Sequence, residues 1–377
     1  MDIVFLTTSL ERGGAETQLV RTAISLKQRG WEVGILTMLP STDFLEEIRA
    51  ANIPLEECAS ARTRLNWRMA LRMTRQLRRW HPTILVTVNY PADAMGRICG
   101  RLAGVPTIIA SVLTAHVKTS LREKFYRFTE PLIALTVSNS KAAVTYMVSR
   151  RILSLEKTVI IPNGMIVSDF PAQITREEAR RELAIPLDAF LWIAVGNLRP
   201  AKDYPTLLEA AARCAKASAV FRLCIVGGGE ALADLNADVD ARGLRGVVRF
   251  LGPRTDVPRV LRAGDAFVLS SAWEGLPNAV MEGMASGLPV VATDVGGVRE
   301  LIDQGRSGFI VPPGDPTALA VQMLAMMSLE AEARGRMGAS ARAYIISHFD
   351  IERVVDMWEE VFGRETIGTG KPRPVQI

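Results

Sequence analysis

Cysteine, histidine and long apolar runs are all scarce in this 377-residue chain. Its four cysteines, Cys58, Cys99, Cys214 and Cys224, show no paired short spacing, and only three histidines accompany them. A disulfide framework needs paired cysteines, so this spacing argues against one. No apolar run approaches the roughly 18 residues of a membrane-spanning helix, and the start of the chain has neither a basic region nor a cleavage site. These absences predict a reduced, cytoplasmic protein whose membrane contact, if any, is peripheral and on the inner face.

A dinucleotide-binding fingerprint is also missing. The segment IVGGGE lacks the GxGxxG spacing, and no acid stands at the right strand end. This absence argues against a nicotinamide-dependent oxidoreductase. The composition is that of an ordinary globular protein, with 48% hydrophobic and 23% charged residues. The chain is about twice the usual domain length, which predicts two domains.

Positive charge is concentrated in the first half of the chain, although the net charge is only +5. Residues 1–170 hold 22 Lys and Arg against 14 Asp and Glu, which leaves +8, and residues 171–377 hold 23 against 26, which leaves −3. Seven arginines lie between Arg62 and Arg79 with no acid among them, and apolar residues recur there at helical steps. One interpretation is a helix on a sheet with a solvated basic face. The other is attraction to an anionic membrane or a phosphate-bearing acceptor, whereas no recognition motif for nucleic acid is present.

Short apolar runs alternate with helix-like segments along the chain. The first half contains DIVFLTTS, WEVGILTM and TILVTVN, and the second half begins again with FLWIAVGNL and FRLCIVGGG. Such alternation predicts an α/β fold with a parallel sheet and crossover helices in each half. We place the linker just after Gly164 and take residues 1–168 and 169–349 as the two domains.

Two loops at expected strand ends suit a phosphate-bearing ligand. Gly13 and Gly14 immediately precede a helix, where the backbone can approach a ligand closely. Arg199 and Lys202 follow the run FLWIAV, at the carboxyl end of a strand, where open α/β sheets bind ligands. Two cations there can hold a diphosphate. A plain strand-to-helix turn and a solvated loop lysine are the alternative interpretations.

The segment from Trp273 to Glu300 combines two acids, a helix start and glycine turns. Asn278 is expected to cap a helix that runs to about Ser286, and the amide groups at a helix start suit a diphosphate. Glu274 precedes this helix and Glu282 lies one turn inside it, where capping does not explain an acid. Carboxylates suit sugar and ribose hydroxyls, so the segment predicts a sugar-nucleotide pocket, with a solvated surface glutamate as the alternative for Glu282.

These two glutamates, separated by seven residues and followed by SGLPVVATDVGG and GFIVPPGD, resemble the signature of glycosyltransferase family 4, in particular the bacterial polysaccharide-type group 1 enzymes. The resemblance implies that Glu274 contacts the donor sugar and Glu282 the ribose. Lys202 matches the family's lysine, Asn197 stands where the family has arginine, and Arg199 is expected to compensate. The further donor-binding residues that the resemblance implies are Gly14, Gly228, Arg249, Leu276, Asn278 and Ala279.

The resemblance also implies the GT-B fold, two Rossmann-like domains that face one another across a cleft. A last helix over 350–365, whose apolar residues recur at helical steps, is expected to cross back to the first domain, and 366–377 to form a flexible tail. Transfer would retain the anomeric configuration through front-side attack, with Glu274, Lys202, Arg199 and His116 at the reacting groups. No cofactor and no metal are expected, because adjacent-but-one acids in the tripeptide Asp238–Asp240 point apart on a helix.

We therefore expect a retaining glycosyltransferase that moves a sugar from a UDP- or GDP-linked donor to a glycan or lipid-linked acceptor in polysaccharide or glycoconjugate biosynthesis. Its partners are the donor, the acceptor and an anionic membrane surface met through Arg62–Arg79. A nucleotide-sugar epimerase of the same architecture and a non-catalytic sugar-nucleotide-binding protein remain the alternatives.

Overall fold

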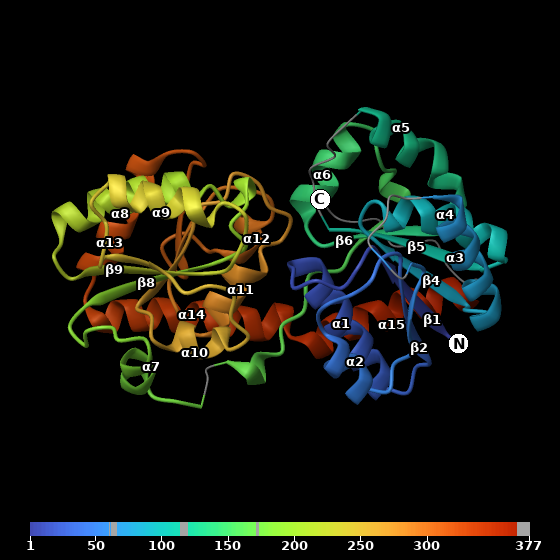
Figure 1. The fold of residues 1–377 in the computed structure, drawn as a ribbon, viewed down its shortest axis with the longest axis horizontal. Helices are drawn as coiled ribbons and strands as arrows, with labels where there is room; N and C mark the ends of the chain where they lie inside the picture. Colours follow the sequence, from blue (N-terminus) through green and yellow to red (C-terminus); the bar gives the residue numbers. More distant parts are fainter. Residues whose placement is uncertain (60, 62–65, 114–119, 171–172, 368–377) are drawn as a thin grey trace. The chain divides into compact units, whose positions relative to one another are not determined.

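The computed structural model describes residues 1–59, 61, 66–113, 120–170 and 173–367, and its ribbon is shown in Figure 1. The chain forms two compact units. Unit 1 comprises Met1–Gly164 and Ile351–Ile377, and unit 2 comprises Met165–Asp350. The chain thus divides at Gly164, where the sequence placed the linker and four residues before the domain boundary given as 168.

Unit 1 is built on a seven-stranded sheet of order β3-β2-β1-β4-β5-β6-β7, in which every pair of neighbours is parallel. Its strands are β1 (Ile3–Thr7), β2 (Val33–Thr37), β3 (Leu55–Glu57), β4 (Ile84–Val88), β5 (Thr107–Val112), β6 (Leu135–Ser138) and β7 (Thr158–Ile160). Its α-helices are α1 (Gly14–Gln28), α2 (Leu45–Ala50), α3 (Trp67–Trp80), α4 (Ala92–Ala103), α5 (Ser120–Thr129), α6 (Lys141–Ser149) and α15 (Ile351–Ile367). The predicted parallel sheet is confirmed.

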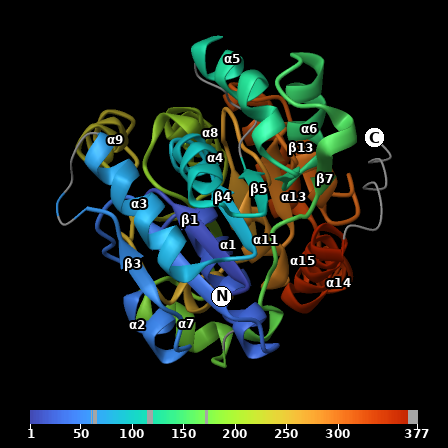
Figure 2. The ribbon, with the colours of Figure 1, turned by 90° about the vertical axis from the view of Figure 1, so that its right-hand side faces the viewer.

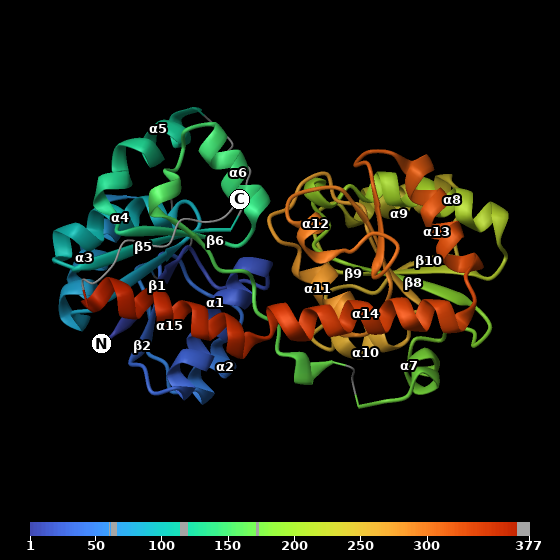
Figure 3. The same ribbon diagram turned by 180° about the vertical axis from the view of Figure 1, so that it is seen from behind.

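Helices cover both faces of this sheet, because successive side chains of a strand point to opposite faces. Val4 and Leu6 of β1 pack in one cluster with Met69, Met73 and Leu77 of α3. The helices α3 and α4 lie together on that face, as the turned view in Figure 2 shows. On the other face α1 contacts α15, and Figure 3 shows these helices side by side.

The last helix, α15, is fastened to unit 1 by apolar and charged contacts. The apolar positions predicted from its spacing are all buried: Ile351, Val354, Val355, Trp358, Val361 and Phe362. Arg29, which follows α1, pairs with Glu352 at 2.6 Å, with Asp356 at 2.6 Å and with Glu359 at 2.7 Å. The helix extends to Ile367, two residues into the tail expected over 366–377, and residues 368–377 lie outside the described part of the chain.

Unit 2 is built on a six-stranded sheet of order β10-β9-β8-β11-β12-β13, again with parallel neighbours throughout. Its strands are β8 (Phe190–Val195), β9 (Phe221–Val226), β10 (Val248–Phe250), β11 (Ala266–Leu269), β12 (Val290–Thr293) and β13 (Gly308–Val311). Its α-helices are α7 (Arg176–Glu182), α8 (Tyr204–Ala217), α9 (Leu232–Ala241), α10 (Val257–Arg262), α11 (Asn278–Ala285), α12 (Val298–Leu301), α13 (Pro316–Ser328) and α14 (Ala331–Phe349).

The two faces of the second sheet bury separate clusters. Trp192 of β8 packs with α8 and α13 on one face, whereas Ile193 packs with α11 and α14 on the other. The strands β8 and β11 are neighbours at the centre of the sheet. Loops that follow these two strands therefore emerge side by side at the carboxyl edge, where ligands bind in open α/β sheets.

The basic helix begins later than the arginine run suggested. The helix α3 starts at Trp67 because the Asn66 side chain caps it, accepting from the amide of Met69 at 3.0 Å. Arg62 and Arg64 lie outside the described residues. The predicted inward positions Met69, Met73 and Leu77 are buried, which confirms an amphipathic helix lying on the sheet.

Candidate functional site

The central feature of unit 2 is a contact between the two most strongly implicated side chains. Lys202 Nζ donates to Glu274 Oε1 at 2.6 Å. Both side chains are mostly buried, with 19% of the lysine and 15% of the glutamate exposed. The sequence indicated separate partners for them, a phosphate and a sugar, but in the structure the two side chains neutralise each other.

Lys202 reaches Glu274 because the loop after β8 leaves room for the lysine side chain. Its side chain passes over Gly196, where a Cβ would lie 2.8 Å from the lysine Cε. Tyr204 Oη donates to the carbonyl of Gly196 at 2.8 Å, and burial, with the nearby Glu274 carboxylate, raises the pKa of Tyr204. Tyr204 is therefore a neutral donor that fixes the strand end beneath the lysine.

The lysine backbone is also fixed to the neighbouring strand. Ser270, just after β11, donates through its hydroxyl to the carbonyl of Lys202 at 2.8 Å. The amide of Ala272 donates to the carbonyl of Ala201, also at 2.8 Å. These bonds join the loop after β8 to the loop after β11, so the two functional side chains are held by connected backbone segments.

The Glu274 loop is held from its other side by the turn after β12. The amide of Gly297 donates to the carbonyl of Gly275 at 2.7 Å. Gly296 has φ +52, and a Cβ there would collide with the carbonyl oxygens of Glu274 and Gly275. Glycine is therefore required at 296 for the turn to approach so closely, which gives a physical reason for the motif DVGG.

The helix α11 begins beside this loop, but its cap differs from the prediction. Pro277 is the N-cap residue and Asn278 is the first helical residue, so Asn278 as a side-chain cap is wrong. Proline favours φ near −65°, which suits the extended backbone of this cap at φ −75 and ψ 107. The helix start still presents backbone amides, and these belong to Asn278 and Ala279.

One stripe of α11 is partly exposed. Asn278 and Glu282, four residues apart, are half-buried, whereas Ala279, Val280 and Met281 between them are buried. Residues at this spacing lie on one helix face. Glu282 therefore sits one turn along the helix from Asn278, on the same stripe. Leu276, by contrast, is buried in the core, where it can shape the site but presents little surface to a ligand.

Two glycine-rich loops pack against each other beyond β8 and β9. The amide of Leu198 donates to the carbonyl of Gly228 at 2.9 Å. The flanking Gly227 and Gly229 have φ +145 and +157, and a Cβ at either would overlap the backbone of Gly196 or Leu198. Asn197 thus lies in a loop in direct backbone contact with Gly228, and both belong to the predicted donor-binding set.

The remaining predicted residues are Arg199, Arg249, Gly14 and His116. Arg199 is exposed and precedes the short 3-10 helix Pro200–Lys202 that contains the lysine. Arg249 lies in β10, and its guanidinium donates to the carbonyl of Leu183, so only its backbone stays a prediction for nucleotide contact. Gly14 is in the first turn of α1 in unit 1. His116 lies outside the described residues.

The acids of the tripeptide Asp238–Asp240 are engaged by arginines. Arg242 donates to Asp238 at 2.7 Å, and Arg245 pairs with Asp240 and lowers its pKa. Within the described part of the chain, no group of three or more His, Cys, Asp or Glu residues is arranged to hold a metal ion. Metal-free transfer stays a prediction.

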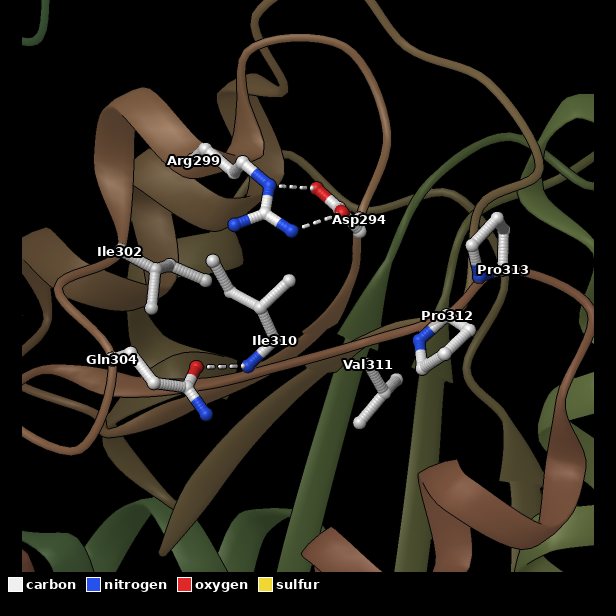
Figure 4. Close-up of a pocket in the computed structure, with 8 residues that line it drawn as sticks. All are labelled: Asp294, Arg299, Ile302, Gln304, Ile310, Val311, Pro312 and Pro313. Carbon is white, nitrogen blue, oxygen red and sulfur yellow. Dashed lines mark hydrogen bonds and ion pairs between the residues drawn. The ribbon is translucent and has the colours of Figure 1, made fainter.

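A cavity of about 480 Å³ lies at the carboxyl ends of β12 and β13, as Figure 4 shows. Arg299 forms a two-point ion pair with Asp294, at 2.8 and 2.6 Å, on one side of it, and Gln304 accepts from the amide of Ile310 at 2.8 Å on another. The predicted donor-binding residues are absent from its lining, which consists of Asp294, Arg299, Ile302, Gln304, Ile310, Val311, Pro312 and Pro313. The candidate site is therefore defined by the Lys202–Glu274 contact and not by this cavity.

Ser271 and Tyr204 are site residues that the sequence interpretation missed. Ser271 Oγ donates to Glu274 Oε1 at 2.6 Å, and Tyr204 supports the strand end under Lys202. The available signal for Ser271 was a hydroxyl three residues before the glutamate, in a loop after an apolar run.

Comparison with known proteins gives consistent matches along the chain. Residues 175–344 match the family described as "Glycosyl transferases group 1", and residues 12–168 match "Glycosyltransferase Family 4". The chain is 25% identical over 337 residues to the UDP-Gal:alpha-D-GlcNAc-diphosphoundecaprenol alpha-1,3-galactosyltransferase of Escherichia coli, covering 86% of each chain. It is also 25% identical over 357 residues to the lipopolysaccharide core biosynthesis glycosyltransferase LpsD of Rhizobium meliloti, covering 93% of this chain and 95% of the relative.

Solved structures show the same architecture. The Anabaena HepE protein in complex with UDP-glucose superposes with a TM-score of 0.84 at 23% identity, covering 96% of this chain and 99% of that one. WaaG, a glycosyltransferase involved in lipopolysaccharide biosynthesis, gives a TM-score of 0.75 at 18% identity, covering 94% and 99%. At these identities the likeness establishes the fold.

Proposed function

We propose that this chain, which belongs to glycosyltransferase family 4, transfers a hexose from a UDP-linked donor to a lipid-linked glycan acceptor with retention of the anomeric configuration. The chain is a glycosyltransferase with the GT-B fold. The UDP-linked donor, the lipid-linked acceptor and the stereochemistry are the proposed parts. The UDP and UDP-glucose complexes of HepE and the lipid diphosphate named for the Escherichia coli relative support the first two.

The observation on which the site assignment rests is the Lys202–Glu274 contact of 2.6 Å at the carboxyl edge of β8 and β11. A sugar diphosphate needs a cation beside its phosphates and a carboxylate beside its sugar. Because the sugar is joined directly to the diphosphate, these two protein groups must lie close together. The α11 helix start adds amide groups and a positive dipole end beside them. These elements together suit a sugar diphosphate better than a simple sugar.

The proposed reaction is a front-side substitution at the anomeric carbon. The acceptor oxygen forms a bond to that carbon on the face from which UDP departs, and the broken carbon–oxygen bond leaves its electron pair on the β-phosphate. The acceptor proton moves to a phosphate oxygen. Lys202, Arg199 and the α11 amides stabilise the growing negative charge, and Glu274 holds the sugar and stabilises the positive charge that develops at its ring.

A basic and apolar surface on unit 1 supports the proposed lipid-linked acceptor. We define it as the outward residues of α3, α4 and α5, which follow one another along one side of the sheet. The arginines of α3 are all exposed, and Trp67, Leu102 and Phe128 expose 69%, 61% and 82% of their surface. Among the described residues no helix is both long and apolar enough to cross a membrane.

Basic and apolar side chains alternate on this surface. Arg68 lies over the Trp67 ring at 5.5 Å, which places a cation next to an aromatic residue suited to a headgroup boundary. Arg72 donates to the carbonyl of Cys58 at 3.3 Å and Arg78 to that of Leu102 at 2.8 Å, so part of the arginine run is used within the fold. Charge and exposed apolar area together favour an anionic bilayer over a soluble acceptor.

The proposed transfer is tested by measuring nucleoside diphosphate release from a panel of UDP- and GDP-linked hexoses, with and without a polyprenyl-diphosphate-linked N-acetylglucosamine acceptor. We expect release from a UDP-linked donor that rises when the acceptor is added, and a product whose anomeric configuration by NMR matches the donor. Inversion of configuration, or turnover restricted to GDP-sugars, would contradict the proposal. Product without acceptor, as an isomerised donor, would instead indicate an epimerase.

A further inference from the structure

Glu274 Oε1 accepts two hydrogen bonds of equal length from very different donors. Lys202 Nζ and Ser271 Oγ each lie 2.6 Å from it. The lysine is a charged, flexible donor that the diphosphate also attracts. The serine is a neutral donor on a short side chain, and it is fully buried.

Ser271 sits on fixed backbone. It lies two residues after the end of β11, and its carbonyl accepts from Thr293 Oγ1 of β12 at 2.7 Å. Thr293 is itself fully buried. A side chain with one rotatable bond, on a backbone tied to two strands, holds its hydroxyl in one place.

The roles of the two donors must diverge when a sugar diphosphate binds. A diphosphate has more negative charge than one carboxylate and draws the Lys202 ammonium toward itself. Glu274 then loses its charged partner at the moment when it has to face the sugar. The hydroxyl of Ser271 is too short and too deeply buried to follow the lysine.

We propose that Ser271 is a positioning residue that keeps the Glu274 carboxylate aimed at the donor sugar after Lys202 turns to the diphosphate. The inference rests on the proposed function and adds a residue to it. Ser271 is not a nucleophile in this assignment, because its complete burial separates its hydroxyl from the anomeric carbon. It acts through Glu274 and touches neither substrate.

Ser271→Ala tests this role with Ser307→Ala as its matched control. Ser307 is also a buried serine of unit 2, and its hydroxyl accepts from the amide of Asp303 at 2.9 Å, away from the site. Both variants lose a buried hydroxyl together with its hydrogen bonds. Loss of a hydrogen bond to a charged group corresponds to about a ten- to hundred-fold effect.

We expect Ser271→Ala to lower the kcat for UDP release from the accepted UDP-sugar by about ten-fold or more, with the Kd for UDP within about two-fold of wild type. Ser271→Thr, which keeps the hydroxyl, should recover part of this loss, and Ser307→Ala should retain turnover. Wild-type turnover in Ser271→Ala would overturn the role of Ser271. So would a parallel loss of UDP affinity and thermal stability, since that pattern marks a purely structural serine.

A crystal structure of the wild-type protein with UDP tests the inference without any variant. The inference requires Ser271 Oγ to remain within hydrogen-bond distance of Glu274 while Lys202 contacts the diphosphate. If the Glu274 side chain instead moves with Lys202 and loses its hydrogen bond to Ser271, the inference is overturned. Failure of the proposed function is recognised separately, as a wild-type protein that releases UDP from no donor.

Discussion

Lys202 and Glu274 are 72 residues apart in the chain, and their side chains share a hydrogen bond of 2.6 Å. Each side chain neutralises the charge of the other. Donor binding therefore exchanges one ion pair for two new interactions, one with the diphosphate and one with the sugar. The consequences of this exchange can be measured.

Lys202→Ala should lower turnover more than it weakens donor binding. The charge on the departing diphosphate grows as the sugar bond breaks, so the ammonium contributes most in the transition state. Steady-state kinetics with the accepted UDP-sugar gives the two effects, and Lys216→Ala, at an exposed lysine of α8, is the control. A rise confined to the donor KM, with kcat intact, would contradict this role.

Glu282→Ala should weaken nucleotide binding by about 1 to 3 kcal/mol, the scale of a charge-assisted hydrogen bond to a ribose hydroxyl. Isothermal titration with UDP measures the change directly. The control is Glu209→Ala, because Glu209 is a partly exposed glutamate of α8 that pairs with Arg213 four residues away. Unchanged UDP affinity in a folded Glu282→Ala protein would defeat the ribose assignment.

Activity should survive excess EDTA. Lys202 and Arg199 supply positive charge for the diphosphate, and Asp238 and Asp240 are already paired with arginines. The rate of UDP release is compared before and after chelation. Activity that disappears with EDTA and returns with Mg²⁺ or Mn²⁺ would show that the metal-free mechanism is wrong.

Vesicle binding should depend on Arg68, Arg75 and Arg79. Among the described residues these arginines of α3 make no ion pair, and each contributes roughly 1 kcal/mol at an anionic surface. Sedimentation with phosphatidylglycerol vesicles should show binding that falls with salt, because screening acts within about 8 Å at physiological ionic strength. The triple substitution to Gln should abolish most of it.

The control for that measurement replaces Arg213, Arg245 and Arg336, three exposed arginines of unit 2, by Gln. It removes the same charge from elsewhere on the chain. Equal binding to neutral and anionic vesicles, or an equal loss in both triple variants, would leave α3 as a structural helix.

Arg180→Met should destabilise unit 2 by about 3 to 5 kcal/mol. Arg180 is fully buried, pairs with Asp265 at 2.6 Å and donates to the carbonyls of Ala263, Pro186, Leu187 and Ala189. Its removal takes the buried guanidinium from these carbonyls and from Asp265, which keeps only Arg176 and the amide of Leu191 as donors. Urea unfolding followed by circular dichroism measures the loss of unfolding free energy. A loss no larger than that of Arg213→Ala, at an exposed site, would contradict the prediction.

Much of the architecture is predictable because buried parallel strands are nearly continuous apolar runs. The runs DIVFLTTS and FLWIAVGNL became β1 and β8, and the apolar spacing near the end became α15. The strand β3 escaped prediction because Leu55–Glu57 is short and largely exposed, and it forms only by pairing with the edge of β2. Asn278 was misplaced because the composition of a helix start does not distinguish a proline cap from an asparagine cap.

The fold class, the family and the segments that contain Lys202, Glu274 and Glu282 can all be identified from the amino-acid sequence, because each depends on periodicity or a motif within a short stretch. The pairing of Lys202 with Glu274, and the contact of Ser271 with the same carboxylate oxygen, depend on the folded chain. The strands β8 and β11 are neighbours in the sheet although β9 and β10 lie between them in the chain. That crossover, set by how the whole sheet packs, brings the two loops together and no local pattern encodes it.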